Sequence, residues 1–304
     1  MTAQRLEIDA QQAGRRADVV LAVWLEASRV QVRRALERGQ VRCNGRTLAA
    51  GDKGRMLAVG DVLEVEGEVD PSQVLPVAQP EIPLDIVASG ADWLIVNKPQ
   101  GAPVHPLAPG ETGTLLNAVI ARRPEIAGVG EGGLRSGVVH RIDVGTSGCV
   151  AFALSEERFA MLRKAFATHA VRKLYRAVVW GPLQGERREE LDLVVAQHQP
   201  ALVRVAATPD SRGARRCALH WRSLAVGADR TLIEVSLETG FLHQIRVTMA
   251  HLGHPVVGDL RYGRADDPAP RLMLHAMSLR VGNVAGDAGP GAGLGAGLDG
   301  ALSP

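Results

Sequence analysis

The sequence of 304 residues has no long apolar run and only three cysteines. No run approaches the roughly 18 apolar residues that suggest a membrane span, and the opening MTAQRLEIDAQQAGRR lacks the apolar stretch of a secretory signal. We therefore expect a cytoplasmic protein that does not enter a membrane. The cysteines Cys43, Cys149 and Cys217 form no CxxC pair, so neither a disulfide framework nor a cysteine zinc site is indicated.

Motifs of several common enzyme classes are also missing. The Walker-type GxxxxGK[ST], the HExxH helix and a GxGxxG that opens a helix do not occur. The segment 145–149 lacks the second glycine of a GxSxG elbow, which disfavours a serine hydrolase. His251 and His254 lie three residues apart, but no acid of fitting spacing accompanies them. The sequence thus indicates carboxylate chemistry with no metal and no organic cofactor.

Lysine is scarce, since only four of the 35 basic residues are lysines. Arginine suits bidentate phosphate contacts and stacking on bases. A GC-rich genome would produce the same bias, and the net charge of +2 says little about partners. Composition therefore leaves open whether the arginines bind nucleic acid.

Residues 15–66 have the pattern of a small module with two helices followed by short strands. The apolar stretch 17–25 predicts the first helix, and Ser28 with Gln31 forms a capping box for the second. Gly39 is a suitable stop for that second helix.

A hairpin and a strand complete this module. Asn44-Gly45 is a strong signal for a tight hairpin turn. Residues 59–65 alternate as a strand does. Six arginines but only one acid, Glu37, occur between residues 28 and 46, which indicates either a phosphate-binding face or a solvated helix face. The arginines are Arg29, Arg33, Arg34, Arg38, Arg42 and Arg46.

The rest of the chain divides into three parts. Residues 67–85 carry four prolines and little periodicity, as a linker does. Residues 86–284 alternate short apolar strands with helices, which predicts one larger α+β domain. Residues 285–304 are rich in glycine and alanine, and we expect a disordered tail.

A segment of the larger domain places an aspartate between two expected strands. The strand 138–143 breaks into the loop 144–148, and a second strand follows over 149–154. This arrangement would present Asp143 at the edge of a sheet, and loops held by a rigid scaffold often carry catalytic groups. On the residues alone, an aspartate in such a loop is more often a loop-capping or salt-bridged residue than a catalytic one.

Two further side chains have both a structural and a functional interpretation. Tyr175 lies in the strand expected over 174–179. It either belongs to the core or stacks against a base, a contact that contributes roughly 1–3 kcal/mol. The helix expected over 243–252 has apolar residues at helical spacing, and Arg246 lies off that buried face near the helix start. Arg246 is then either an ordinary surface residue or a counter-ion.

The segment HRIDVGTSG closely resembles the H-R-[LI]-D-x-x-T-S-G signature of the family of pseudouridine synthases that modify large ribosomal RNA and transfer RNA. Further blocks resemble that family in the same order, and the resemblance spans about residues 15–282. They are 93–106, 113–118, 173–181, 239–247 and 251–259. Residues 15–66 resemble a small RNA-binding domain first known from a ribosomal small-subunit protein, with Arg16-Ala17-Asp18 where Arg-Leu-Asp is usual.

The resemblance implies a fold, a reaction and a set of roles. The fold would be α+β, with a central mixed, largely antiparallel sheet flanked by helices. Asp143 would attack the target nucleotide, Tyr175 would stack on the base, and Arg246 would keep Asp143 ionised. An enzyme that acts on a base of folded RNA extrudes it, and Arg141 would brace the gap. The other implied substrate-binding residues are His140, Thr146, Ser147, His243 and Gln244.

The resemblance also implies an RNA partner, with ribosomal RNA favoured and transfer RNA possible. We expect a monomer, although the sequence leaves the oligomeric state open. Phe241-Leu242 stands where the family has Arg-Thr, and Thr248 replaces a common histidine, so we expect altered substrate choice with retained catalysis. Two other functions stay open. One is a catalytically inactive RNA-binding or ribosome-assembly factor on the same fold, and the other is hydrolytic removal of a base.

Overall fold

The computed structural model describes residues 4–291, apart from residues 26, 28 and 68–73. The chain forms two compact units. The smaller unit comprises Met1–Leu75 and Glu131–Leu134, and the larger comprises Pro76–Gly130 and Arg135–Pro304.

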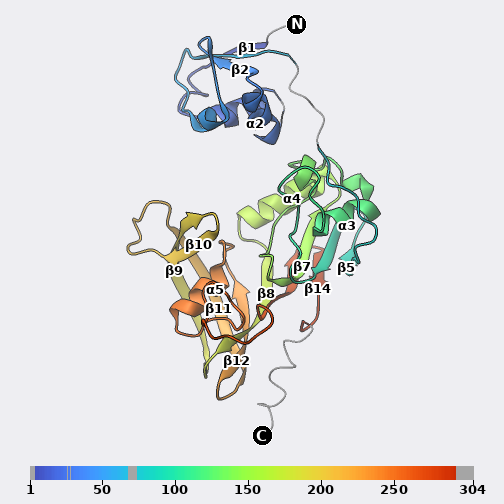
Figure 1. Ribbon diagram of the computed structural model, residues 1–304, viewed down its shortest axis with the longest axis vertical. Helices are drawn as coiled ribbons and strands as arrows, with labels where there is room; N and C mark the ends of the chain where they lie inside the picture. The colour runs from blue at the N-terminus through green and yellow to red at the C-terminus, as the bar shows by residue number, and fades with distance from the viewer. Residues whose placement is uncertain (1–3, 26, 28, 68–73, 292–304) are drawn as a thin grey trace. The chain divides into compact units, whose positions relative to one another are not determined.

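The small unit is a four-stranded antiparallel sheet with two helices, drawn in blue in Figure 1. The strand order is β1-β4-β2-β3. The elements are β1 (Gln4–Glu7), α1 (Ala17–Trp24), α2 (Arg29–Glu37), β2 (Val41–Cys43), β3 (Arg46–Thr47), the 3₁₀ turn η1 (Ala50–Gly54) and β4 (Val62–Val65). An apolar cluster of both helices and the sheet forms its core.

Local backbone conformations explain why the small unit folds as its sequence predicts. Gly39 follows α2 with φ of 69°, the left-handed conformation in which glycine ends helices. Asn44 and Gly45 both have positive φ, 53° and 77°, and turn the chain between β2 and β3. The predicted hairpin is therefore confirmed. The strand β1 lies before residue 15 and pairs with β4, and the expected cap Ser28 lies outside the described residues.

The large unit is built on a ten-stranded mixed sheet. Its order is β10-β9-β11-β12-β8-β13-β7-β6-β5, and β14 pairs with β13. Among the described residues, the strand pairs of this sheet are antiparallel except β13 with β7, so the expected mixed, largely antiparallel α+β fold is confirmed. The strands are β5 (Ile86–Ser89), β6 (Trp93–Lys98), β7 (Ser147–Ala153), β8 (Arg172–Trp180), β9 (Glu186–His198), β10 (Ala201–Val205), β11 (Arg215–Val226), β12 (Arg230–Leu237), β13 (Leu274–Val281) and β14 (Val284–Asp287).

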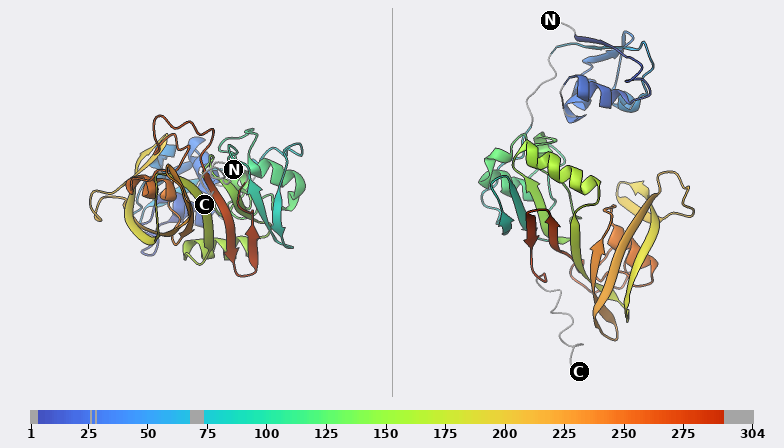
Figure 2. Two further views of the ribbon diagram at one scale, coloured as in Figure 1. Left: turned by 90° about the horizontal axis from the view of Figure 1, so that it is seen from below. Right: turned by 180° about the vertical axis from the view of Figure 1, so that it is seen from behind.

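Three helices cover parts of this sheet, as Figures 1 and 2 show. Each helix is buried through its own apolar cluster: α4 with β6, β7 and β13, α3 with β6 and β7, and α5 with β8, β11 and β12. In α5 the predicted buried face is confirmed, because Ile245 and Met249 pack against Ala177 and Val179 of β8. The helices are α3 (Leu115–Arg122), α4 (Glu156–Ala167) and α5 (Gln244–His251), and the 3₁₀ turns are η2 (Pro124–Ile126) and η3 (Gly133–Arg135).

One predicted strand is wrong. Within 138–143, Val138 makes an isolated bridge to Phe152, and the remainder is loop. Side chains take the hydrogen bonds that a strand would have made: His140 Nε2 accepts from the Ala151 amide at 2.9 Å, and the Val139 carbonyl accepts from Arg163 at 3.0 Å. The loop that carries Asp143 is thus longer than the sequence indicated.

Parts of the expected linker and tail are also ordered. In the linker 67–85, the Val77 carbonyl accepts from Asn117 of α3 at 2.7 Å. In the tail 285–304, β14 extends to Asp287, and residues 292–304 lie outside the described part. Among the residues that the structure describes, no helix is long and apolar enough to span a membrane, and no cluster of three metal-ligating side chains occurs.

Candidate active site

Asp143 lies in the loop that precedes β7 and is half-buried. The Thr146 amide donates to the Asp143 carbonyl at 3.0 Å, which closes a turn just before the strand begins. The next strand residues are fixed between β6 and β13. A rigid strand therefore holds the carboxylate-bearing loop from its C-terminal side.

Arg246 of α5 brings two carboxylates together. Its Nη1 donates to Asp143 Oδ2 at 2.8 Å, although the two residues are 103 positions apart. Its Nε and Nη2 donate to the two carboxylate oxygens of Asp259 at 2.7 and 2.8 Å. The Arg246 side chain is 11% exposed and that of Asp259 is fully buried. The planar fork of arginine suits this bidentate geometry.

Burial and charge act in opposite directions on this pair. Burial lowers the pKa of Arg246, but the hydrogen bonds and charges of Asp259 and Asp143 outweigh burial and raise it. Burial likewise raises the pKa of Asp259, and the hydrogen bond and charge of Arg246 bring it below its ordinary value. Arg246 and Asp259 are therefore both charged at neutral pH.

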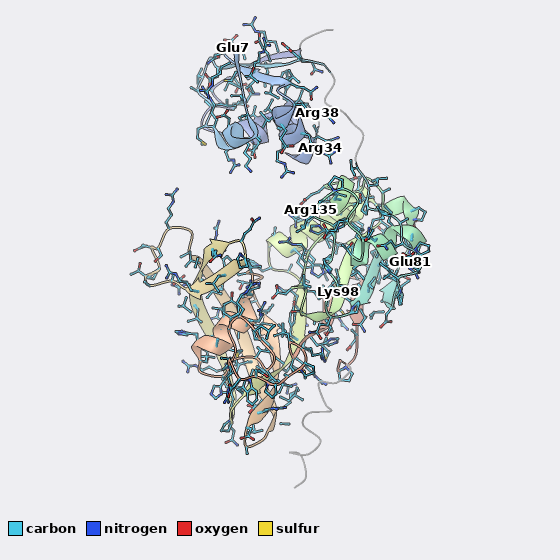
Figure 3. All side chains as sticks on the ribbon, in the orientation of Figure 1. Glu7, Arg34, Arg38, Glu81, Lys98 and Arg135 are labelled. Atoms are coloured by element: carbon cyan, nitrogen blue, oxygen red, sulfur yellow. The ribbon has the colours of Figure 1, made fainter. Side chains whose placement is uncertain are left out.

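Lys98, labelled in Figure 3, supports the same loop from the end of β6. Its fully buried Nζ donates to the carbonyls of Pro99, Ala102 and Val144 at 3.0, 2.8 and 3.1 Å. Burial lowers the pKa of Lys98 to about 8, and the charge of Asp143 opposes that shift. The buried Lys98 ammonium group thus connects Val144, the residue after Asp143, to the loop that follows β6.

Tyr175 of β8 also lies within electrostatic range of Asp143. Burial raises the pKa of the Tyr175 phenol, and the negative charge of Asp143 raises it further. Tyr175 therefore keeps its proton. His243, immediately before α5, places Nε2 3.8 Å from Asp143 Oδ2 and Nδ1 2.7 Å from the hydroxyl of Tyr262. The structure thus gathers Asp143, Tyr175, Arg246 and His243.

A profile of the RNA pseudouridylate synthase family matches residues 92–251, which include this site. The chain belongs to that family. An uncharacterized RNA pseudouridine synthase of Synechocystis sp. is 37% identical over 273 residues, which cover 88% of this chain and 81% of the relative. Ribosomal large subunit pseudouridine synthase D of Yersinia pestis is 32% identical over 298 residues, covering 92% and 88%.

Solved structures agree with this family. The protein described as human RNA Pseudouridylate Synthase Domain Containing 1 superposes with a TM-score of 0.55 at 25% identity, covering 66% of this chain and 78% of its own. Human RNA Pseudouridylate Synthase Domain Containing 4 has a TM-score of 0.57 at 18% identity, covering 70% and 91%, and shows the shared fold.

Four of the residues expected to bind substrate lie mainly inside this pseudouridine synthase fold. The amide of Gln244 is buried, accepts from the Thr239 hydroxyl and the Phe241 amide, and donates to the Ala218 carbonyl. The Ser147 hydroxyl makes a hydrogen bond with Nδ1 of His275, a buried residue of β13, and Thr146 is buried. Their contact with substrate stays a prediction.

His140 is the fourth of these residues. Its ring accepts from the backbone of β7 and stacks on Phe166 at a centroid distance of 4.5 Å. Burial lowers the pKa of His140 to about 3, and the charge of Lys173 adds to this. His140 is therefore neutral. Arg141 is exposed and has no ion pair within the described residues.

Phe241 and Leu242, the departure from the family pattern, pack against an apolar cluster. Both are partly buried against residues of β9, β10 and β11 together with Val247 of α5. Their side chains thus contribute to packing between α5 and the β9–β10 hairpin. The altered substrate choice expected from these two positions stays a prediction.

The six arginines expected to bind RNA are not equivalent. Arg33 pairs with Glu37 at 3.3 Å, and Arg42 pairs with Glu66 at 3.1 Å. Arg34 is half-buried, whereas Arg38 and Arg46 are exposed, and the side chain of Arg29 lies outside the described residues. Figure 3 labels Arg34 and Arg38 at α2.

Sequence reasoning gave no role to Asp259, Lys98 or Tyr262. Asp259 and Lys98 lie in the segments GHPVVGD and VNKP, which resemble the family. The resemblance therefore marked both residues, but it did not indicate which residues they contact. Asp259 reaches Arg246 from a turn 13 residues further along the chain, which no helical or strand spacing predicts.

Proposed function

We propose that this RNA pseudouridine synthase isomerises uridines of ribosomal RNA, and that Asp143 is the group that reacts with the target nucleotide. The pairing of Asp143 with Arg246 at 2.8 Å carries the proposal. Arg246 donates a charge-assisted hydrogen bond to the half-buried carboxylate and fixes its orientation. Asp143 Oδ1 has no hydrogen-bond partner within the described residues, so one oxygen is available to the nucleotide.

The reaction rearranges one nucleotide without loss of atoms. The bond from the ribose to a ring nitrogen of uracil breaks, the base rotates, and the ribose is joined to a ring carbon. That carbon then loses its proton, and the freed ring nitrogen gains one. Direct attack on the sugar and removal of a sugar proton both use the same carboxylate. Tyr175, which keeps its proton, is the residue that we expect to stack on the base, and the exposed Arg141 precedes Asp143 by two residues.

The choice of ribosomal RNA rests on the relatives and on the small unit. Relatives named for the large ribosomal subunit include proteins of Yersinia pestis, Xanthomonas campestris and Zymomonas mobilis. The arginines of α2 add a basic surface that a phosphate backbone attracts. Transfer RNA is the alternative target that mapping would reveal.

The Asp143→Asn variant tests the proposal. Asparagine keeps the shape but removes the charge, so pseudouridine formation should fall by at least about a thousandfold while RNA binding is retained. The measurement is pseudouridine mapping of total RNA from cells that carry the wild type, the variant or neither. Full modification by Asp143→Asn would contradict the proposal. Release of free uracil with an abasic product would instead show hydrolysis.

A further inference from the structure

Tyr262 connects His243 to the strand β10. The Val203 amide donates to the Tyr262 hydroxyl oxygen at 2.9 Å, and the same oxygen lies 2.7 Å from His243 Nδ1. A backbone amide can only donate, so the hydroxyl oxygen accepts from Val203. The oxygen keeps a second lone pair, but among the described residues Nδ1 is the acceptor within reach of the hydroxyl hydrogen, so donation to Nδ1 is the arrangement that pairs this hydrogen. A neutral His243 therefore carries its proton on Nε2.

The other side of the His243 ring faces the reacting carboxylate. Nε2 lies 3.8 Å from Asp143 Oδ2, which is longer than a hydrogen bond but close enough for a favourable interaction with an N–H group. Asp143 Oδ2 is also the oxygen that accepts from Arg246. The two donors therefore converge on one oxygen and leave Oδ1 for the nucleotide.

The ring of Tyr262 holds both donors in place. It meets the His243 ring edge-on, with centroids 5.5 Å apart and an interplanar angle of 70°. The Arg246 guanidinium carbon lies 5.1 Å from the centroid of the Tyr262 ring. His243 itself has φ of 53°, a left-handed conformation that is costly for a residue other than glycine and that often occurs at functional sites.

The surroundings keep His243 neutral. Burial lowers its pKa, the charge of Asp143 raises it, and the charge of Arg246 lowers it further. Arg261 and Asp259 are the other charged groups that face this ring, and their effects oppose each other. A neutral imidazole has only one N–H, so its function depends on which nitrogen carries the proton.

We propose that Tyr262 is a positioning residue whose hydroxyl selects the tautomer of His243 with Nε2–H directed at Asp143. This inference rests on the proposed role of Asp143 and extends it. The selected tautomer gives Oδ2 of Asp143 a second donor beside Arg246. Without the hydroxyl, His243 can place its proton on Nδ1 and turn an unprotonated Nε2 toward the carboxylate, where two lone pairs repel.

The Tyr262→Phe variant of the full chain tests this directly. Phenylalanine keeps the ring beside Arg246 and His243 and removes only the hydroxyl. We expect ¹⁵N NMR of labelled histidine to show Nε2–H at His243 in the wild type and a loss of that preference in the variant. The kcat should fall about tenfold, because a lone pair replaces the favourable Nε2–H group beside the carboxylate, with an unchanged KM for RNA.

Two further variants separate the hydroxyl from general damage. Tyr262→Leu also removes the ring and should lower kcat more than Tyr262→Phe. His243→Gln carries an amide donor at the position of Nε2 that needs no tautomer, so adding Tyr262→Phe to His243→Gln should cause no further loss of kcat. A tenfold loss in that background as well would show a structural role of the hydroxyl and overturn the inference.

The NMR measurement does not depend on the reaction. A wild-type His243 with its proton on Nδ1, or an Nε2–H preference unchanged in Tyr262→Phe, would overturn the inference even if Asp143→Asn is inactive. Conversely, full activity of Asp143→Asn would refute the proposed function while the tautomer measurement still reports on Tyr262.

Discussion

At the scale of single residues, Arg246 satisfies two carboxylates that the chain brings from different loops. Its three nitrogens make hydrogen bonds of 2.7 to 2.8 Å to Asp143 and Asp259. Removal of one partner of a buried ion pair leaves the other charge desolvated and uncompensated. A lysine has the same charge but no planar fork, so it could not bind both carboxylates in this way.

Asp259→Asn should destabilise the protein by about 3 kcal/mol at pH 7, because it breaks a buried pair. The pKa of Asp259 is below its ordinary value in the folded protein. The stability that ionised Asp259 contributes is therefore fully present above its unfolded pKa of about 4. That stability is lost as the pH falls through the lower pKa of Asp259 in the folded protein. Urea unfolding at pH 7 and at lower pH measures both effects, and the difference between wild type and variant should shrink on acidification.

Glu125→Gln is the matched control, because Glu125 pairs with Arg123 at 2.6 Å but is 48% exposed. That change should cost less than about 1 kcal/mol. Equal losses in Asp259→Asn and Glu125→Gln would contradict the buried-pair account.

Sequence reasoning could reach some of these residues and not others. Asp143, Arg246 and Tyr175 were expected to act together, and the structure places them within interaction range. The partners Asp259 and Tyr262 could not be inferred, because their contacts depend on how a turn folds back on α5. That turn is set by the Asp259 side chain, which accepts from the amides of Arg261 and Tyr262.

At the scale of elements, the start of β7 fixes where the Asp143 loop ends. Gly148 has φ of 111°, and a Cβ added there would collide with the Ala276 carbonyl of β13. This close approach occurs at the parallel pairing of β7 with β13. The sequence showed a glycine in this loop, but only the pairing of two distant strands shows why glycine is needed.

Gly148→Ala should therefore destabilise the protein by about 3 kcal/mol or more, since it adds both backbone strain and a collision. Gly145→Ala is the control in the same loop, where the nearest atom to an added Cβ is Leu272 Cδ2 at 3.4 Å. It should change stability by about 1 kcal/mol or less. Chemical unfolding of both variants provides the comparison, and similar midpoints would show that the β7–β13 contact tolerates a methyl group.

Helices and strands with clear periodicity were predicted well, because burial of an apolar face dominates their formation. The helix α5 and the strand β8 are examples, and both pack their expected faces into one cluster. The strand expected over 138–143 failed for a specific reason. Val138 and Val139 are buried and Ile142 is half-buried, but the hydrogen bonds that the His140 ring accepts and Arg163 donates replace the pairing that a strand requires.

At the scale of the whole molecule, our proposals assign affinity for RNA and reactivity toward one nucleotide to different residues. The net charge of +2 is small for a protein that binds a polyanion. Local clusters of charge must therefore provide the attraction. The arginines of the small unit form one such cluster, and Figure 3 labels Arg34 and Arg38 at α2.

The double variant Arg34→Glu/Arg38→Glu should raise the dissociation constant for RNA about tenfold at moderate salt and leave kcat at saturating RNA unchanged. The logarithm of the association constant for RNA falls linearly with the logarithm of the salt concentration, and the magnitude of this slope should decrease by roughly one to two. Filter binding across a salt series measures both quantities. The control is Arg5→Glu/Arg15→Glu, which changes two exposed arginines of the same unit outside α2. An equal weakening by both pairs would show that only total charge matters.

The charges around the reacting carboxylate have a consequence for how long RNA stays bound. Asp143 and Asp259 are balanced by Arg246 and Lys98, so these four groups together carry no net charge at neutral pH. Uridine and pseudouridine carry the same charge as well. The proposed catalytic centre therefore gains no electrostatic preference for substrate over product, and we expect the residence time of modified RNA to depend on the arginines of the small unit and on the salt concentration.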